Sequence, residues 1–371
     1  MDFEPTEEQR LLINTVERFT KDFYSDGQRS AYSSLETGFS PDAWAVMAEA
    51  GLLALPFSED SGGLGGYPAD LTYVAKALGN RLCVEPFVLG TILAGTIMER
   101  IGTNAQKTAW LSKIIDGTGQ LALAHSEEKA RYNLSFVETC YKQKTDNVLL
   151  SGEKYFVMAA GGANAFIVSA IPDEFTQTTT DHADVMRFFL VHSSADGLER
   201  KSYRLTDGSV ANKLTLNDVI AEPMEHGYAE FSTAITKTKI AACAEMIGIM
   251  EYLFEATLDY LKTREQFGKP LSKFQVIQHR MADLYTSLEL SQSHLHRMIA
   301  GNPSEAGYSQ DIAGAKAFIS DAAVNLAQEA VQLHGGIGVT DELAIGHGLK
   351  RILVLSKLFG DADTELKRSL Q

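Results

Sequence analysis

The spacing of apolar and polar residues divides the chain into three regions. From residue 6 to about 118, apolar residues such as Leu11, Leu12, Val16, Phe19 and Phe23 follow helical spacing. From about residue 121, short β-type runs separated by turns replace this pattern, and beyond about residue 228 long helical patterns return. This order predicts an N-terminal helical domain over 1–118, a middle β domain over 119–227 and a C-terminal helical bundle over 228–371.

Local signals place individual elements within these regions. Thr6 and Gln9 match a capping box, and Ser40 followed by Pro41 predicts the start of a second helix. The glycine-rich stretch 58–67 lacks the Lys-Ser/Thr ending of a phosphate loop and is interpreted as a turn, and the polar stretch 173–184 as a surface loop. The predicted strands are 121–124, 148–150, 155–158, 166–169 and 188–192, and the predicted bundle helices are 234–263, 274–298, 309–333 and 341–358.

Composition and charge narrow the classes of partner. The 371 residues carry a formal net charge of -15, and a field of that sign repels nucleic acid phosphates and anionic lipid. Cys83, Cys140 and Cys243 lie far apart, so we expect neither a disulfide framework nor a zinc site. No apolar run approaches the roughly 20 residues that span a bilayer, and the N-terminus is acidic instead of basic. We therefore expect a cytoplasmic protein that binds neither nucleic acid nor membrane.

Two segments carry a resemblance to a known family. Residues 263–275 contain the pattern R-x-x-F-G-x-x-L-x-x-x-Q between two predicted helices, and residues 332–338 contain Q-x-x-G-G-x-G. Both, in this order, resemble signatures of the acyl-CoA dehydrogenase family, and so does the order of the three domains. The resemblance covers nearly the whole chain. It implies a mainly α fold with a β insert, in which a helical domain, a β-barrel-like domain and a four-helix bundle follow one another.

The residue types in these segments suit a flavin dinucleotide. Arg264 offers a charged fork for a pyrophosphate, Phe267 an apolar surface for a ring, and two glycines permit close backbone approach. In the alternative interpretation Arg264 is an ordinary helix-terminal charge and Phe267 a core residue. The resemblance implies FAD seated mainly on a neighbouring subunit, an acyl-CoA substrate, a homo- or hetero-oligomer built as a dimer of dimers, and an electron-transfer flavoprotein as electron acceptor. The predicted FAD contacts here are Arg264, Gln266, Phe267, Gln275, Gln332, Gly335 and Gly336.

The family's catalytic base is missing from its usual places. Members remove the α proton of an acyl thioester with a carboxylate, but Phe359 occupies the position that most of them give to this glutamate. Thr238 occupies the position on the first bundle helix that a minority uses. Glu245 lies two helical turns after Thr238 on the same predicted face, among small and apolar neighbours. We predict Glu245 as the base; the alternative is a glutamate satisfied by an arginine or a backbone donor.

The family's flavin motif in the β domain is altered. The segment Ser126-Glu127-Glu128 is a weak version of a Thr-Glu motif, Phe156 takes the place of an aromatic residue near the flavin ring, and Met158 replaces a common hydroxyl residue. The resemblance implies that Ser126, Phe156 and Met158 contact FAD. Together with the displaced base and the Phe-Gly-Asp-Ala-Asp stretch at 359–363, they resemble the smaller subunit of two-gene dehydrogenases, heterotetramers that act on steroid side-chain or pimeloyl-type CoA esters.

Three functions are open to such a chain. The first, which we predict, is FAD-dependent α,β-dehydrogenation of an acyl-CoA thioester to the 2-enoyl-CoA, in fatty acid or steroid catabolism. The second is a non-catalytic partner that completes the FAD or substrate site of a homologous chain. The third is flavin monooxygenase or other base-free chemistry on the same fold, for which the sequence gives no positive sign.

Overall fold

The computed structural model describes residues 4–24, 27–145, 147–175, 181–225 and 227–371. It forms two compact units, each made of separate stretches of chain. The helical unit comprises Met1–Ser25, Pro68–Cys83 and Lys239–Gln371, and the mixed unit comprises Asp26–Tyr67 and Val84–Thr238. Helix α7, Tyr228–Thr263, belongs in part to each unit. The three domains expected from the sequence are a different division of the chain and stay a prediction.

The N-terminal part of the helical unit is a helix pair. The first helix, α1 (Glu7–Phe23), begins with the expected capping box, in which the Thr6 hydroxyl accepts from the Gln9 amide and the Gln9 side chain accepts from the Thr6 amide. It packs on α4 (Pro68–Asn80), and the Gln9 side chain donates a 2.9 Å hydrogen bond to Asp70. Of the predicted apolar stripe of α1, Val16 and Phe19 are buried and Leu12 and Phe23 half-buried, whereas Leu11 is exposed.

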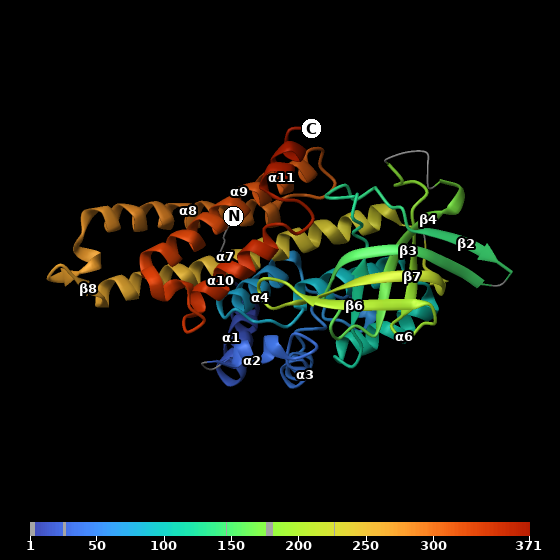
Figure 1. Ribbon diagram of the computed structural model, residues 1–371, viewed down its shortest axis with the longest axis horizontal. Helices are drawn as coiled ribbons and strands as arrows, with labels where there is room; N and C mark the ends of the chain where they lie inside the picture. The colour runs from blue at the N-terminus through green and yellow to red at the C-terminus, as the bar shows by residue number, and fades with distance from the viewer. Residues whose placement is uncertain (1–3, 25–26, 146, 176–180, 226) are drawn as a thin grey trace. The chain divides into compact units, whose positions relative to one another are not determined.

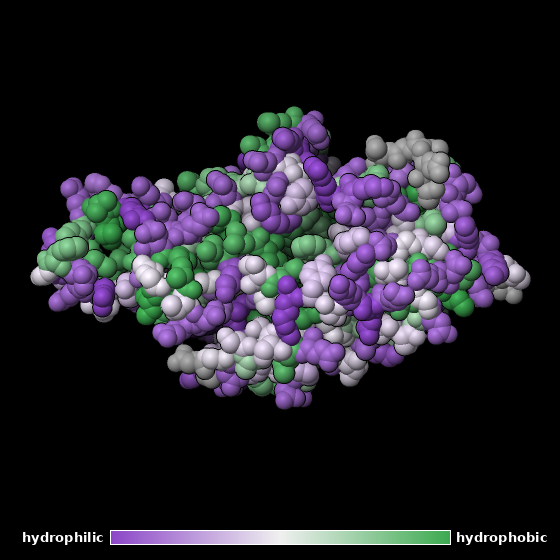
Figure 2. Space-filling view, in the orientation of Figure 1, coloured by the Kyte–Doolittle hydropathy of each residue, from purple (hydrophilic) through white to green (hydrophobic). Residues whose placement is uncertain are grey.

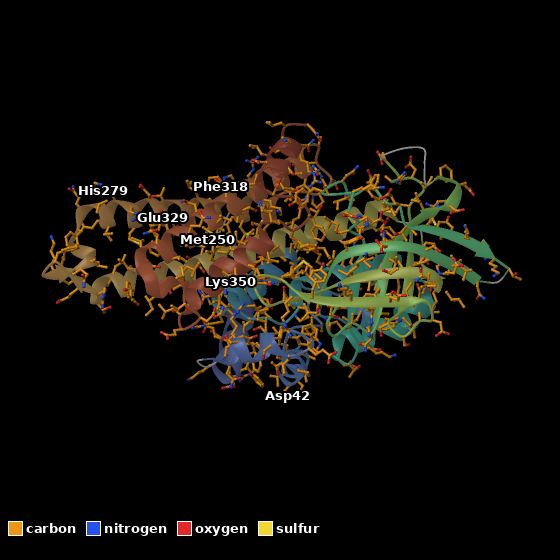
Figure 3. The ribbon with its side chains drawn as sticks, viewed as in Figure 1. Asp42, Met250, His279, Phe318, Glu329 and Lys350 are labelled. Carbon is orange, nitrogen blue, oxygen red and sulfur yellow. The ribbon has the colours of Figure 1, made fainter. Side chains whose placement is uncertain are left out.

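The C-terminal part of the helical unit is built around α9, which packs against three other helices (Figure 1). Arg280 links α8 to α9 by donating to Glu329 at 2.6 Å, and Met250 of α7 is fully buried (Figure 3). The four predicted helices are confirmed with shifted ends, and one short helix follows them. The elements after α7 are α8 (Gln275–Ala300), α9 (Tyr308–His334), the 3-10 helix η5 (Gly335–Val339), α10 (Ala344–Leu355) and α11 (Ala362–Ser369).

Helices α4 and α7 cross through two glycines. A Cβ atom on Gly79 would lie 2.3 Å from the carbonyl oxygen of Glu245, and one on Gly248 would lie 1.9 Å from the carbonyl oxygen of Lys76. No real Cβ atom tolerates such distances, so hydrogen is the largest group that fits at either position. The crossing therefore rests on main chain against main chain, which fixes the backbone around Glu245.

The mixed unit begins with short helices. Ser40 caps α3 and Pro41 is its first residue, as predicted. The glycine-rich stretch 58–67 is a turn containing only a 3-10 segment, also as predicted. The nine residues of the π-helix η2 are all buried, which fits a sequence that is apolar apart from Thr91. The helical elements are α2 (Gln28–Ser34), α3 (Pro41–Glu49), η1 (Glu59–Ser61), η2 (Phe87–Gly95), α5 (Thr96–Ile101) and α6 (Asn104–Ile115).

The strands of the mixed unit close into a barrel. Strand β5 pairs with both β4 and β7, so the order β4, β2, β3, β7 and β5 returns to β4, with β1 added beside β4 and β6 beside β7. The barrel encloses apolar side chains that include Leu150, Phe166 and Leu214. The strands are β1 (Leu121–Ala124), β2 (Cys140–Lys144), β3 (Asn147–Met158), β4 (Ala165–Pro172), β5 (Arg187–His192), β6 (Leu198–Arg204) and β7 (Val210–Pro223).

The structure corrects the predicted strands in two ways. The runs 148–150 and 155–158 belong to one strand, β3, which a bulge interrupts between Lys154 and Val157. Strands β2 and β6 were not predicted, because they are polar and mostly exposed and therefore lack an alternating apolar pattern. Strand β7 was not predicted either, although many of its residues are buried. Residues 176–180 of the predicted loop lie outside the described residues. Within the described ranges, no helix is long and apolar enough to cross a membrane.

Candidate functional site

The first motif of the helical unit forms a projecting hairpin between α7 and α8. Strands β8 (Glu265–Gln266) and β9 (Lys269–Pro270) pair, and the Leu271 amide donates to the Arg264 carbonyl at 2.9 Å to close the base. Phe267 and Gly268 form the two-residue tip, with φ angles of 52° and 79°. Positive φ at both central residues is the geometry of a type I′ turn, which normally takes asparagine or glycine. A phenylalanine there is held in a conformation it rarely adopts.

The hairpin presents its tip to solvent. The Phe267 side chain is 89% exposed, and its ring lies edge-on to that of Phe274, with ring centroids 6.2 Å apart. The Lys269 ammonium lies 4.3 Å from the centroid of the Phe274 ring. The alternative in which Phe267 is a core residue is therefore wrong for this chain taken by itself. Arg264, Gln266 and Gln275 are exposed as well, so the whole motif is accessible to another molecule.

The second motif forms the C-terminal end of α9. Gln332 is exposed in the last turn, and Gly335 ends the helix with φ 69°. A Cβ atom added to Gly335 or Gly336 would meet nothing within 4 Å. Close packing inside this chain thus does not account for the two glycines, whereas an outside molecule has room to approach the bare backbone here.

Tyr260 and His334 join the two motifs. Their rings are stacked with centroids 4.4 Å apart and an interplanar angle of 24°, and the Tyr260 hydroxyl donates to the His334 carbonyl at 3.3 Å. Tyr260 lies in the last turn of α7, and its carbonyl accepts from the amide of Arg264, the residue after the helix, at 2.8 Å. His334 directly precedes Gly335 and is buried. The hairpin and the glycine turn are therefore held on one framework, a connection that the motifs alone did not reveal.

Glu245 is buried in α7, as predicted, and is paired. It is 5% exposed, and its Oε1 accepts from the Arg351 Nε of α10 at 2.7 Å. This contact is the one expected from the alternative interpretation, in which an arginine satisfies the carboxylate. The assignment of Glu245 as the base stays a prediction. Thr238, two turns earlier, is fully buried, and its hydroxyl donates to the Ala234 carbonyl.

Phe359, at the usual position of the base, lies in a firmly held turn. It has φ 58°, and its carbonyl accepts from the Arg368 guanidinium at 2.7 Å. The next carbonyl, of Gly360, accepts from the buried Lys316 ammonium at 2.6 Å. Glu365 neutralises part of this charge because it accepts from Lys239 at 2.9 Å and also pairs with Arg368. Asp361, which follows Gly360, caps α11 and accepts from the Thr364 amide at 3.0 Å.

The three residues of the mixed unit predicted to contact FAD lie in or near the bulge of β3. Phe156 has φ 53° within the β3 bulge and is 56% exposed, and its amide donates to the Tyr203 hydroxyl at 3.1 Å. Ser126 follows β1, and its carbonyl accepts from the Tyr155 amide at 2.8 Å, beside the bulge. Met158 ends β3 half-buried. The structure thus brings Ser126 next to the segment that carries Phe156.

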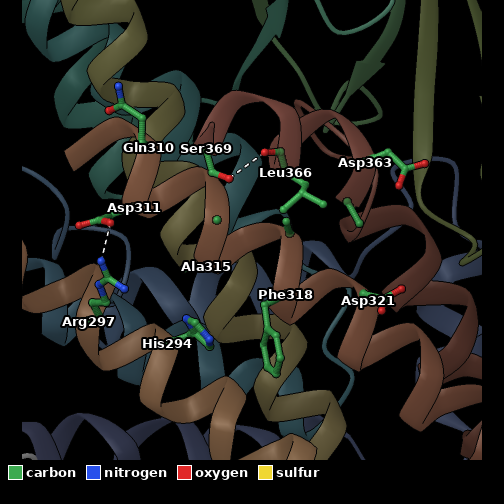
Figure 4. Close-up of a pocket in the computed structure, with 13 residues that line it drawn as sticks. His294, Arg297, Gln310, Asp311, Ala315, Phe318, Asp321, Asp363, Leu366 and Ser369 are labelled. Atoms are coloured by element: carbon green, nitrogen blue, oxygen red, sulfur yellow. Dashed lines mark hydrogen bonds and ion pairs between the residues drawn. The ribbon is translucent and has the colours of Figure 1, made fainter. Parts of the chain in front are cut away.

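A separate pocket of about 550 Å³ lies between α8, α9 and α11 of the helical unit (Figure 4). Its walls include the Arg297–Asp311 ion pair and the tilted rings of His294 and Phe318, 4.6 Å apart. None of the predicted site residues lines it. The described residues contain no cluster of His, Cys, Asp or Glu suited to a metal ion.

Comparison with known proteins identifies two family regions. The model of the acyl-CoA dehydrogenase C-terminal domain matches residues 225–369, and that of the N-terminal domain matches residues 6–118. The chain is 27% identical to the probable acyl-CoA dehydrogenase YngJ of Bacillus subtilis, over 99% of this chain and 98% of that protein.

Solved structures are similar to this chain over nearly its whole length. A variant of the Tcur3481-Tcur3483 steroid ACAD is 26% identical, has a TM-score of 0.87 and covers 98% of this chain and 96% of its own. The structure of PigA with FAD and proline shares the fold at 24% identity and a TM-score of 0.89, covering 100% of this chain and 99% of its own. The predicted fold class is confirmed. The chain is an oxidoreductase of the acyl-CoA dehydrogenase family.

Proposed function

We propose that this chain catalyses the FAD-dependent α,β-dehydrogenation of an acyl-CoA thioester to the 2-enoyl-CoA as one subunit of an oligomer. The observation that carries the proposal is the joined surface of the helical unit. An exposed arginine and phenylalanine on one motif and two bare glycines on the other are fixed together by the Tyr260–His334 stack. Such preorganisation suits the binding of a large, rigid ligand.

The residues fit a flavin dinucleotide. The exposed Arg264 can bind a pyrophosphate, and the exposed ring of Phe267 can lie against a ring of the cofactor. The backbone at Gly335 and Gly336 can be contacted directly. The side chains of Gln266, Gln275 and Gln332 reach solvent and supply amide hydrogen bonds. In the mixed unit, Ser126, Phe156 and Met158 would contact the flavin. The bound flavin supplies the acceptor for the hydride that leaves the β carbon.

The proposed base is Glu245. In its favour are its burial and its rigid backbone, fixed by the Gly79 and Gly248 crossing. Arg351, whose Nε donates to Glu245 Oε1, would then release or share the carboxylate when substrate binds. A base must reach within hydrogen-bonding distance of the α proton, so this role requires access from the acyl group to the second carboxylate oxygen.

The proposed assembly is a homo- or hetero-oligomer with a homologous chain, a dimer of dimers. Its support is the exposed apolar surface at the end of the helical unit that carries the hairpin, where Phe267 is 89% and Val276 65% exposed (Figure 2). Exposed apolar surface of this kind marks interaction sites. The heteromeric steroid enzyme among the similar structures supports a bulky steroid-type or dicarboxylic CoA ester as substrate. Electron-transfer flavoprotein is the proposed electron acceptor, and the cytoplasm the proposed location.

A second function is favoured by a specific observation. Phe359 and Thr238 occupy both positions that the family gives to its base, and Glu245 is already paired with Arg351. A chain with these features would serve as a non-catalytic partner that completes the FAD or substrate site of a homologous subunit.

One set of measurements separates the two functions. The chain is purified alone and after co-expression with a homologous chain, and its visible absorption is recorded before and after addition of acyl-CoA. We expect the protein to contain flavin whose visible absorption decreases when acyl-CoA reduces it. The variant Glu245→Gln is expected to keep the bound flavin but to show no such decrease. Glu251→Gln is the matched control, because Glu251 is another ion-paired glutamate of α7, 2.7 Å from Lys76.

The outcomes distinguish the proposals. Bleaching by Glu245→Gln at the wild-type rate would remove Glu245 as the base and favour the non-catalytic partner. A protein without flavin in either preparation would contradict both functions.

A further inference from the structure

A fully buried lysine, Lys154, lies on strand β3 of the mixed unit. The Lys154 ammonium donates to Glu127 Oε1 at 2.6 Å, to the Ser169 hydroxyl at 3.1 Å and to the His125 carbonyl at 3.4 Å. The side chain of Lys154 is 0% exposed and that of Glu127 is 4% exposed. The flavin contacts predicted from the family motifs do not include either residue.

The network holds the residues on both sides of Ser126. His125 Nδ1 lies 2.9 Å from the Ser169 hydroxyl, and the His125 ring packs 4.8 Å from that of Phe231. Glu127 Oε1 also accepts from the amide and the hydroxyl of Thr139, at 3.0 and 2.7 Å. The backbone of Ser126 is thus fixed by its two neighbours, one through a ring and the other through a carboxylate.

The same network holds the start of the β3 bulge. Lys154 is the last residue of β3 that pairs with β7 before the bulge, and Tyr155, which follows it, donates its amide to the Ser126 carbonyl at 2.8 Å. The next residue, Phe156, is the one with positive φ and an exposed ring. One buried ammonium therefore ties the segment of Ser126 to the segment of Phe156. Bulges commonly direct a side chain at a functional site.

The charges of the network are mutually dependent. Burial and the Lys154 charge lower the pKa of His125 to about 3, so its imidazole is neutral. Burial alone would raise the pKa of Glu127, but the charge and hydrogen bond of Lys154 outweigh it, and the pKa is lowered. Glu127 is thus ionised beside the ammonium.

Stability alone does not explain such a pair. Replacing a buried ion pair by well-packed apolar residues is often neutral or stabilising, because desolvation cancels much of the attraction. What the pair does here is to set the geometry of two segments that are separate in the sequence. Both segments carry a residue that the proposed function assigns to the flavin.

We propose that Lys154 and Glu127 are positioning residues that fix Ser126 and the Phe156 bulge in the geometry that binds the isoalloxazine end of the flavin. The inference rests on the proposed function, because it concerns the same cofactor. It adds two residues that make no predicted flavin contact themselves.

The test uses the full chain, in the preparation that holds flavin, and the variants Lys154→Met and Glu127→Gln/Lys154→Met. In the double variant the glutamine oxygen can still accept from Thr139 while both charges are gone. We expect the dissociation constant for FAD to rise about tenfold or more, and the visible spectrum of bound flavin to change, even where the unfolding midpoint of the double variant is close to that of the wild type.

A second readout needs no flavin. Hydrogen exchange at the amides of residues 126–127 and 155–156 is expected to become at least about tenfold faster in the variants, because the contacts that restrict these segments are lost. Lys129→Met is the matched control: the Lys129–Glu138 pair has a 2.8 Å distance in the same region, but its side chains are 72% and 41% exposed. Flavin affinity and exchange should both be unchanged in it.

The outcomes are separable. Wild-type FAD affinity and exchange in both variants, with only a lower unfolding temperature, would overturn the inference and leave the network a structural one. If Lys154→Met does not fold, Ser169→Ala removes only the hydroxyl shared by His125 and Lys154 and is expected to show the same changes to a smaller degree. A wild-type protein that never binds FAD would instead contradict the proposed function, whatever the exchange rates show.

Discussion

The ring of Tyr260 lies almost flat against that of His334, 4.4 Å away, while its hydroxyl donates to the His334 backbone carbonyl. One side chain thereby fixes both the direction in which α7 leaves toward the hairpin and the point at which α9 ends. Tyr260→Phe keeps the stack and removes the hydrogen bond, so a loss of about 0.5–1.5 kcal/mol in the free energy of unfolding is expected. Tyr260→Leu should cost more because it also removes the stack.

Urea titration measures these losses, and flavin content measures the coupling between the motifs. We expect Tyr260→Leu to lower flavin retention together with stability. Normal flavin retention in a folded Tyr260→Leu protein would mean that the two motifs do not need this connection.

The glycine crossing of α4 and α7 predicts an unusual response to alanine. In most helices Gly→Ala is favourable by about 1 kcal/mol, but at Gly248 the new methyl group would lie 1.9 Å from the Lys76 carbonyl oxygen. Gly248→Ala is therefore expected to destabilise the protein by about 1–3 kcal/mol or more. Gly314→Ala in α9 is the control, since its Cβ would lie 3.4 Å from that of Ser369 in ordinary contact, and it should stabilise slightly. Equal effects of the two changes in thermal unfolding would contradict the crossing.

The Glu245–Arg351 pair predicts strong coupling in a double-mutant cycle. Arg351→Met leaves a buried carboxylate without its 2.7 Å partner, and a loss of about 3–5 kcal/mol is expected. Glu245→Gln in the same protein should restore part of this loss, because the uncompensated charge is removed. Denaturant unfolding of the four proteins gives the coupling energy, and additive losses would show that the two side chains act independently.

Burial of His125 predicts a loss of stability in mild acid. Its pKa is about 3 in the folded protein and 6.5 when exposed, so between these values the unfolded state binds one more proton. Stability therefore falls as pH decreases below 6.5, with a slope that approaches about 1.4 kcal/mol per pH unit from this residue. Unfolding measured between pH 6.5 and 5 in the wild type and in His125→Gln isolates the contribution, since the variant should have the shallower slope. Parallel curves would contradict a neutral buried imidazole.

The strained tip of the hairpin predicts opposite effects on folding and on binding. Phe267→Asn places a residue that tolerates positive φ where φ is 52°, and the ring that is lost is 89% exposed. The stability of the isolated chain should be unchanged or slightly higher, while flavin content and oligomer size, measured by light scattering, should fall. The matching change at Tyr67, which is 77% exposed in the mixed unit, should affect neither.

Long periodic segments made most of the fold predictable. Helices α8 and α9 were predicted within a few residues because their 26 and 27 positions repeat the same apolar spacing. Strands β2 and β6 could not be predicted, since their side chains face water and carry no alternation. The β3 bulge left a sign that was misinterpreted as a break between strands: the buried positions shift phase between Leu150 and Val157.

The candidate site divides in a similar way. The hairpin and the glycine turn were recognisable because their residues are consecutive. The Tyr260–His334 stack and the Lys154 network join residues that lie far apart along the chain, and no local pattern specifies such a contact. For Lys154 a signal did exist, because a lysine in phase with Val148 and Leu150 predicts an inward-facing charge that needs a partner.

The discontinuous helical unit also sets an order of events during synthesis. Helix α4 packs against α7 as well as α1, and its crossing with α7 depends on Gly79 and Gly248. A ribosome releases Pro68–Cys83 long before residues near 248, while every strand of the barrel emerges in between. The mixed unit can therefore fold first, while α1 and α4 still lack their C-terminal packing partners. The helical unit becomes complete only after the C-terminal helices have left the exit tunnel.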